Sequence, residues 1–185
     1  MPASGRAARR DRAAWGWYPL RDEWARRIVA ASGVRPGELV LDIGAGHGAL
    51  TVPLLDAGAR VIAIELHPQR LAALDVLASG RPRLTVVRAD AAVLRLPRQP
   101  FRVVANPPYA VTSDLLARLL APGSRLSSAH LVLQRDAARR WAEGRGPGAG
   151  RWLRAFHLGV ASSVPRSAFH PAPPVDSAVL HIHRR

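Results

Sequence analysis

The chain has 185 residues, about the length of one domain, and 48% of them are hydrophobic, which is enough for a sizeable core. Its 27 basic residues are all arginine and outnumber the 13 acidic residues, for a formal net charge of +14. The sequence contains no cysteine, which excludes disulfides, thiolate metal centres and cysteine nucleophiles, and no apolar run approaches the roughly 18 residues of a membrane helix.

The excess of arginine points to a polyanionic partner. A guanidinium group binds phosphate through two parallel hydrogen bonds and stacks on bases. A GC-rich genome explains arginine in place of lysine, but not twice as many basic as acidic residues, so we expect a nucleic acid as the partner. Residues 1–14 combine Arg6, Arg9, Arg10 and Arg12 with small residues, which predicts a flexible basic arm. No apolar run follows these charges as in a secretory signal, and we expect a cytoplasmic protein.

After the arm, the spacing of apolar residues predicts helices that alternate with short, nearly continuous apolar strands. The expected helices are 20–32, 49–57, 68–78, 111–121 and 135–143, and the expected strands are 39–43, 60–64, 84–88, 101–105, 129–133, 158–164 and 177–182. This order predicts an α/β fold with a mostly parallel sheet that helices cover on both faces. No helix is evident between the last two strands, so one of them should run antiparallel. Residues 144–150, GRGPGAG, predict a flexible loop.

A glycine-rich turn follows the first strand, and acids follow the next two. Gly44, Gly46 and Gly48 form a GxGxG pattern, in which backbone N–H groups can approach a ligand at a helix N-terminus. The GxGxxG spacing of dinucleotide-binding turns is absent, which argues against a nicotinamide dehydrogenase. Glu65 ends the second strand, where an acid can accept hydrogen bonds from both ribose hydroxyls, and Asp90 follows the third, where a carboxylate can bind an adenine amino group. Solvated surface acids are the alternative for both.

The fourth strand ends at the tetrapeptide Asn106-Pro107-Pro108-Tyr109. Its two prolines remove two backbone donors and stiffen the turn. The side-chain oxygen of Asn106 and the carbonyl of Pro107 can then accept both hydrogens of an exocyclic amino group. This would direct the nitrogen lone pair at an electrophile while Tyr109 stacks on the ring. A merely rigid loop is the alternative.

The glycine turn with Asp42 before it, the two acids and the tetrapeptide together resemble the S-adenosylmethionine-dependent adenine-N6 methyltransferases. Two further segments are similar to signatures of the rRNA adenine dimethylase family: residues 131–138, LVLQRDAA, and residues 169–179, FHPAPPVDSAV. Within that family the chain most resembles the Erm enzymes, and the resemblance runs from about residue 15 to residue 183.

The resemblance implies a class I methyltransferase fold of seven strands over residues 15–185, with S-adenosylmethionine as the cofactor. It implies methylation of an adenine in 23S rRNA, which confers resistance to macrolides, lincosamides and streptogramin B. The target base would be flipped out of its helix and stacked between Tyr109 and Phe169, although Phe169 could instead belong to the core. The residues implied to contact the cofactor are Tyr18, Leu20, Asp42, Gly44, Ala45, Gly46, Glu65, Leu66, Asp90, Ala91 and Asn106.

The chain departs from the family at both ends. The family's N-terminal G-Q-N-F-L lines up with residues 16–20, GWYPL, so contacts with the cofactor would be made by backbone or aromatic groups here. The family's C-terminal helical domain has no counterpart after the last strand, which resembles the short mycobacterial Erm proteins. We therefore expect the basic arm, with Arg135, Arg139 and Arg140, to hold the RNA.

We expect no metal site, because His181 and His183 share one side of a strand but have no third ligand. We also expect a monomer without membrane contact. Two alternatives to the 23S rRNA enzyme stay open: a 16S rRNA dimethyladenosine transferase, and a non-catalytic RNA-binding protein on a methyltransferase scaffold.

Overall fold

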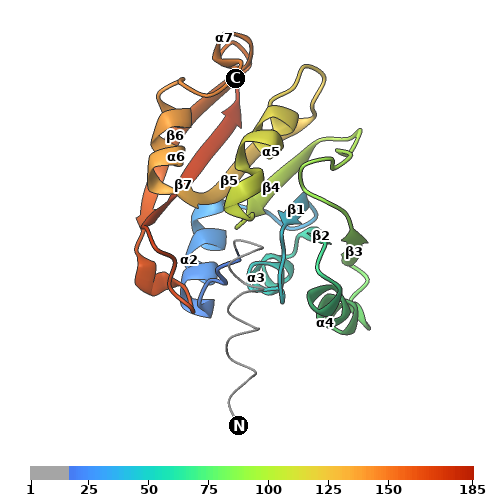
Figure 1. The fold of residues 1–185 in the computed structure, drawn as a ribbon. Coiled ribbons are helices and arrows are strands. Elements are labelled where there is room, and N and C mark those ends of the chain that lie inside the picture. Colours follow the sequence, from blue (N-terminus) through green and yellow to red (C-terminus); the bar gives the residue numbers. More distant parts are fainter. Residues whose placement is uncertain (1–16) are drawn as a thin grey trace.

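The computed structural model describes residues 17–185, so the predicted basic arm lies outside the described residues. Seven strands form one sheet in the order β3-β2-β1-β4-β5-β7-β6, with helices on both faces (Figure 1). The strands are β1 Leu39–Ile43, β2 Arg60–Glu65, β3 Leu84–Arg88, β4 Phe101–Ala105, β5 Leu126–Gln134, β6 Phe156–Val164 and β7 Ser177–Arg184. The helices are α2 Asp22–Ser32, α3 Thr51–Asp56, α4 Pro68–Ala78, α5 Thr112–Leu119, α6 Arg135–Ala142 and α7 Ala149–Trp152, with short 3₁₀ turns at Tyr109–Val111 and Arg166–Ala168.

The predicted α/β fold with a mostly parallel sheet is confirmed. Strands β1 to β5 pair in parallel, whereas β7 runs antiparallel to both β5 and β6. The connection between β6 and β7 holds only the 3₁₀ turn at Arg166–Ala168, which is too short for a crossover helix, so the chain must return antiparallel. The parallel strands therefore all end at one edge of the sheet, and the side chains that follow them meet there.

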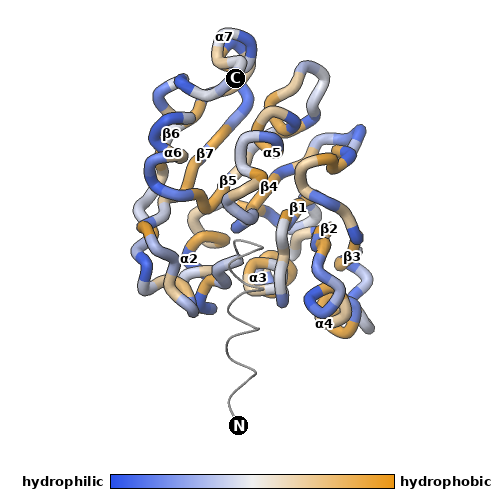
Figure 2. Tube along the Cα trace, in the orientation of Figure 1, coloured by the Kyte–Doolittle hydropathy of each residue, from blue (hydrophilic) through white to orange (hydrophobic). Residues whose placement is uncertain are grey.

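Two hydrophobic layers flank the sheet. Helices α2, α3 and α4 pack on one face and α5, α6 and α7 on the other. Every residue of β1, which lies between β2 and β4, is buried, and all of them except Asp42 are apolar. Figure 2 shows hydrophobic residues gathered along the strands and hydrophilic ones in the loops between them. None of the helices in residues 17–185 has the length and apolar character needed to cross a membrane.

The predicted flexible loop over 144–150 is wrong at its last two residues, where α7 begins. Trp152 anchors this short helix: its ring lies 5.5 Å from that of Trp141, and its Nε1 donates a hydrogen bond to the Pro147 carbonyl at 3.1 Å. A Cβ atom on Gly146 would overlap the Trp141 ring, so glycine at this position permits close packing. Packing of the two tryptophans therefore orders a segment whose composition alone indicates flexibility.

Candidate active site

The glycine turn after β1 is tightly enclosed. Gly44 and Gly46 have φ angles of 76° and 59°, in the left-handed region that favours glycine. A Cβ atom would lie 2.9 Å from Cδ of Pro108 in the first case and 2.8 Å from Nε1 of Trp17 in the second. The turn therefore lies in direct contact with both the tetrapeptide after β4 and the segment before α2.

The amides of this turn bond to the protein itself. Those of Gly44 and Ala45 both donate to the Ile64 carbonyl, at 2.8 and 3.0 Å, and that of Gly46 donates to Oε2 of Glu65 at 2.8 Å. The expectation that these N–H groups face a ligand is thus not met in this structure. The absence of a Cβ atom at Gly44 and Gly46 instead lets Pro108 and Trp17 approach the backbone closely.

Glu65 is buried at the end of β2 and accepts three backbone hydrogen bonds. Its Oε1 atom accepts hydrogen bonds from the amides of Leu66 and His67, at 2.8 and 2.9 Å, and its Oε2 atom accepts one from the amide of Gly46. A carboxylate has about four lone-pair positions. Acceptor capacity therefore stays open on Oε2, and the predicted contact of Glu65 with the ribose hydroxyls stays a prediction.

Trp17, which lies before α2, packs against this turn at Gly46, and Arg70 of α4 stacks on the Trp17 ring. The Arg70 guanidinium lies 4.0 Å from the centre of the Trp17 ring, and its Nη1 atom lies 3.9 Å from Oε1 of Glu65. The ring of His47 is 5.4 Å from that of Trp17. Sequence reasoning missed Arg70, because nothing in its helical context distinguishes it from a surface arginine.

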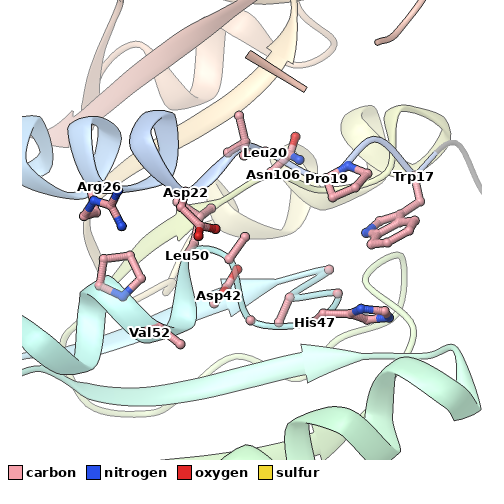
Figure 3. Close-up of a pocket in the computed structure, with 16 residues that line it drawn as sticks. Trp17, Pro19, Leu20, Asp22, Arg26, Asp42, His47, Leu50, Val52 and Asn106 are labelled. Carbon is pink, nitrogen blue, oxygen red and sulfur yellow. The ribbon is translucent and has the colours of Figure 1, made fainter. Parts of the chain in front are cut away.

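Two adjoining cavities lie along the carboxyl edge of the sheet. The first, about 380 Å³, opens between α2, α3 and the glycine turn (Figure 3), and the second, about 220 Å³, opens between the ends of β2, β3 and β4. Gly44 lines both. Of the predicted cofactor residues, the first cavity contains Leu20, Asp42, Gly44, Ala45, Gly46 and Asn106, and the second contains Gly44, Glu65, Leu66, Asp90 and Ala91. The structure thus brings together every predicted cofactor residue except Tyr18, which lines neither cavity.

Asp42 is a buried acid with an unused acceptor. Its Oδ2 atom accepts a hydrogen bond from the Thr51 hydroxyl at 2.6 Å, while Oδ1 is buried without a partner among the described residues. Burial, together with the nearby charge of Glu65, raises the pKa of Asp42 to about 7. At the edge of the second cavity, Asp90 accepts a hydrogen bond from the Ala92 amide at 2.8 Å through Oδ1, which leaves Oδ2 for another donor.

The tetrapeptide holds Asn106 in a defined orientation. Its Nδ2 atom donates a hydrogen bond to the Tyr18 carbonyl at 2.8 Å, which fixes the amide so that Oδ1 points away from that carbonyl. Within residues 17–185 nothing donates to Oδ1 of Asn106 or to the Pro107 carbonyl. Figure 3 shows Asn106 beside Leu20 and Pro19 at the rim of the first cavity. The backbone of Tyr18 therefore orients Asn106, whereas the predicted contact between Tyr18 and the cofactor stays a prediction.

Tyr109 and Phe169 have different surroundings. The Tyr109 hydroxyl shares a hydrogen bond with Ser177 at 2.9 Å, and its ring stacks on that of Tyr18 with centroids 5.7 Å apart. Burial raises the pKa of the Tyr109 phenol, so the hydroxyl stays protonated near neutral pH. Phe169 is only 1% exposed and pairs with Leu20 through an isolated β-bridge. Phe169 therefore belongs to the core, which was the alternative to its predicted role in stacking on the target base. Its ring offers no open face to a base in this conformation.

The predicted RNA-binding arginines are only partly described. Arg6, Arg9, Arg10 and Arg12 lie outside the described residues. Arg135 is exposed but pairs with Asp176, with Nη1 and Oδ2 3.4 Å apart. Arg139 and Arg140 are exposed on the last turn of α6, and neither forms an ion pair among the described residues.

Comparison with known proteins places this site in context. Residues 20–185 match the family described as ribosomal RNA adenine dimethylase. The ribosomal RNA small subunit methyltransferase A of Leifsonia xyli is 42% identical over 173 residues, which cover 86% of this chain and 61% of that protein. The rRNA adenine N-6-methyltransferase of Saccharopolyspora erythraea is 34% identical, over 100% of this chain and 49% of the relative.

Two solved structures share most of the fold. The 23S rRNA methyltransferase ErmE superposes with a TM-score of 0.81 at 32% identity, over 90% of this chain and 69% of that one. A dimethyladenosine transferase from Plasmodium falciparum superposes with a TM-score of 0.77 at 25% identity, over 90% and 62% of the two chains. The chain spans about 61% of the length of the small-subunit relatives that it matches.

Proposed function

Because the chain belongs to the ribosomal RNA adenine dimethylase family, whose members are S-adenosylmethionine-dependent adenine-N6 methyltransferases, we propose that it methylates N6 of an adenine in ribosomal RNA. Its seven-stranded sheet has the class I methyltransferase fold of the two solved relatives. The observation that carries the proposal is the orientation of Asn106, which leaves an amide oxygen and the adjacent Pro107 carbonyl as acceptors beside the cavities.

The residues around the two cavities fit S-adenosylmethionine. Asp42 has a buried oxygen without a partner among the described residues, and Glu65 and Asp90 each keep acceptor capacity. Glu65 would accept a hydrogen bond from a ribose hydroxyl, and Asp90 would accept one from the adenine amino group. Leu66 and Ala91 would be apolar neighbours of the adenine base. Gly44 lines both cavities and would let the cofactor pass close to the backbone from one to the other.

The acceptors after β4 suit an amino group as the nucleophile. An exocyclic N6 has two hydrogens, and Oδ1 of Asn106 and the Pro107 carbonyl can each accept one. With both hydrogens held, the nitrogen lone pair is oriented, and positioning of this kind can contribute roughly 7–11 kcal/mol to the barrier reduction. Tyr18 covers one face of the Tyr109 ring, so the target base would stack on the other face.

S-adenosylmethionine supplies an electrophilic methyl carbon bound to a positively charged sulfur. The protein then needs no strong base, because the amino nitrogen becomes acidic once it carries the developing charge, and its proton can pass to water. This is consistent with a site in which two of the carboxylates that line the cavities, Asp42 and Glu65, already accept hydrogen bonds from protein groups.

We expect Asn106→Ala to lower methyl transfer at least ~100-fold, as for the removal of one preorganised catalytic hydrogen bond. The affinity for S-adenosylmethionine should change little, because Asn106 contributes only part of the rim of one cavity. Transfer of labelled methyl groups to ribosomal RNA measures the first quantity and calorimetry the second. Wild-type turnover in the variant would contradict the role of Asn106.

For the substrate, we propose 23S rRNA, with macrolide–lincosamide–streptogramin B resistance as the cellular result. This is supported by the similarity to ErmE and by the Saccharopolyspora relative, which aligns over the whole chain. Small-subunit rRNA is the second candidate, favoured by the 42% identity to the Leifsonia protein. The chain covers 69% of ErmE and 61% of the Leifsonia protein, so an experiment is needed to choose between the two substrates.

The two substrates are separated by offering the purified protein each ribosomal RNA in turn. Methylation of 23S rRNA, together with raised macrolide resistance in a sensitive host that expresses the protein, is the expected result. Methylation confined to small-subunit rRNA, with no change in resistance, would support the second candidate. If wild-type protein binds S-adenosylmethionine but methylates neither RNA, the enzymatic proposal itself is wrong.

A further inference from the structure

Six arginines surround two adjoining grooves at the end of the sheet that the active site does not use. The grooves, about 710 and 670 Å³, share Gly123, Ser124 and Arg125. No acidic residue of the described part of the chain lines either of them. The six arginines are Arg95, Arg98, Arg118, Arg125, Arg184 and Arg185, and all six are exposed. We call this surface the basic groove.

The charge of the basic groove is not neutralised within residues 17–185. None of its arginines forms an ion pair there, although five other arginines do. Arg184 and Arg185 donate from Nε to the carbonyls of Leu126 and Leu153, at 2.9 and 3.2 Å, and Arg118 donates to that of Ala92. These neutral carbonyls orient the guanidinium groups without cancelling their charge.

The basic groove and the candidate active site lie at opposite ends of the strands. Pro100 and Leu126, at the starts of β4 and β5, line the groove, whereas Asn106 follows the end of β4. Five residues of strand separate them, which is roughly 17 Å at ~3.3 Å per residue. In Figure 1 two of the segments that line the groove, the loop after α5 and the loop before β4, lie at the same end of the sheet as the C-terminus. A nucleotide in the active site therefore cannot itself occupy the groove.

We propose that the basic groove binds the phosphate backbone of RNA that flanks the target adenine. This inference rests on the proposed function, which identifies the polyanion as RNA. The contact itself is inferred from the charges of the groove. An unpaired set of guanidinium groups along a trough fits a chain of regularly spaced phosphates. Phosphate contacts position an RNA without reading its sequence, so the groove would orient the substrate while the active site selects the base.

The test is binding of a labelled RNA duplex of about 20 base pairs, measured by fluorescence anisotropy over a range of salt concentrations. Arg98→Gln with Arg125→Gln removes two groove charges, and neither side chain makes a hydrogen bond among the described residues. The slope of log affinity against log salt should flatten by about 1.8, or 0.9 per phosphate contact. The matched control, Arg60→Gln with Arg83→Gln, removes two exposed arginines at the β2–β3 side and should leave the slope nearly unchanged.

Three results would overturn the proposal: an unchanged slope in the groove variant, an equal flattening in the control, or a groove variant that no longer binds phosphatidylglycerol vesicles while its RNA binding persists. The last would make the groove a membrane-binding surface instead. The test is independent of the proposed function, because affinity for S-adenosylmethionine and methyl transfer by the wild type are measured separately. A groove that binds RNA in a protein that methylates none would reject the proposed function alone.

Discussion

At the scale of single residues, Glu65 combines two tasks. It lines the second cavity, and it also receives the amides of Gly46, Leu66 and His67. Glu65 is therefore a candidate for binding the cofactor, and its hydrogen bonds also connect the glycine turn to the loop after β2. Removal of this carboxylate would leave three backbone donors without their acceptor, each with a desolvation cost of about 1–3 kcal/mol.

We therefore expect Glu65→Ala to weaken S-adenosylmethionine binding by about 1.5–3 kcal/mol, the range for a hydrogen bond to a charged group, and to lower folding stability as well. For stability, Asp90→Ala is the comparison, since Asp90 accepts only one backbone amide and its removal should cost less folding free energy. Calorimetry gives the affinities and urea unfolding the stabilities. An unchanged affinity in Glu65→Ala would mean that the carboxylate serves the protein alone.

The identity and position of these acids could be predicted from the sequence, because parallel strands end at one edge and their last residues must gather there. Their hydrogen bonds could not. Whether Glu65 keeps two free lone pairs or one depends on where Gly46 and His67 direct their amides, which no local pattern specifies. The same holds for Asn106, whose orientation depends on a carbonyl at Tyr18, 88 positions away in the chain.

At the scale of elements, strands β5, β7 and β6 carry four histidines on one face. His130 lies opposite His181 with ring centroids 4.5 Å apart, and His157 lies opposite His183 at 4.9 Å. Within the described residues no group of three or more side chains is arranged to hold a metal ion. Burial and the neighbouring charges lower the pKa of His130 to about 4, and that of His181 moves in the same direction.

A lowered pKa makes this part of the sheet sensitive to acid. Between pH 6.5 and about 4 the unfolded chain binds a proton at His130 that the folded chain excludes, so folding stability decreases as the pH falls through this window. Asp42 has the opposite sign, because its raised pKa makes the folded chain bind the extra proton between its ordinary value of 3.8 and about 7. The two contributions partly cancel in the wild type, so only a variant separates them.

We expect His130→Phe to remove the acid sensitivity that His130 contributes. Relative to the wild type, the variant should gain up to about 3 kcal/mol of folding stability between about pH 7 and pH 4.5, since one pKa unit corresponds to ~1.4 kcal/mol. Urea unfolding at several pH values measures this difference. His157→Phe, at an exposed position of the same face, should show a smaller gain or none. A difference between wild type and His130→Phe that does not depend on pH would show that His130 titrates normally.

The boundaries of helices and strands could be predicted from the sequence where burial requires a pattern of apolar residues. Strands β1 and β4 are covered on both faces, so their apolar runs mark them out, and their predicted bounds are correct. Helix α7 escaped prediction because it is stabilised by the contact of Trp152 with Trp141 rather than by its own four residues. Short segments held by tertiary packing carry no periodic signal.

At the scale of the whole molecule, the net charge of +14 is distributed over separate surfaces. The basic groove contributes six arginines, and α6 contributes Arg139 and Arg140. Residues 2–12, outside the described part of the chain, contribute four arginines against Asp11. If these surfaces bind different phosphates of one RNA, each should add its own share to the salt dependence of binding, because interactions at distant sites are close to additive.

Deletion of residues 2–12 should therefore flatten the salt slope of RNA binding by about 2–4, at ~0.7–0.9 for each phosphate that the protein no longer binds, while affinity for S-adenosylmethionine stays the same. Combined with Arg98→Gln and Arg125→Gln, the deletion should flatten the slope by the sum of the two separate effects. Fewer phosphate anchors should also loosen the choice among neighbouring adenines, which primer extension on the methylated RNA detects. An unchanged slope after the deletion, with a single modified adenine, would show that residues 2–12 do not contact the substrate. A combined effect smaller than the sum would instead mean that the N-terminal residues and the basic groove compete for the same phosphates.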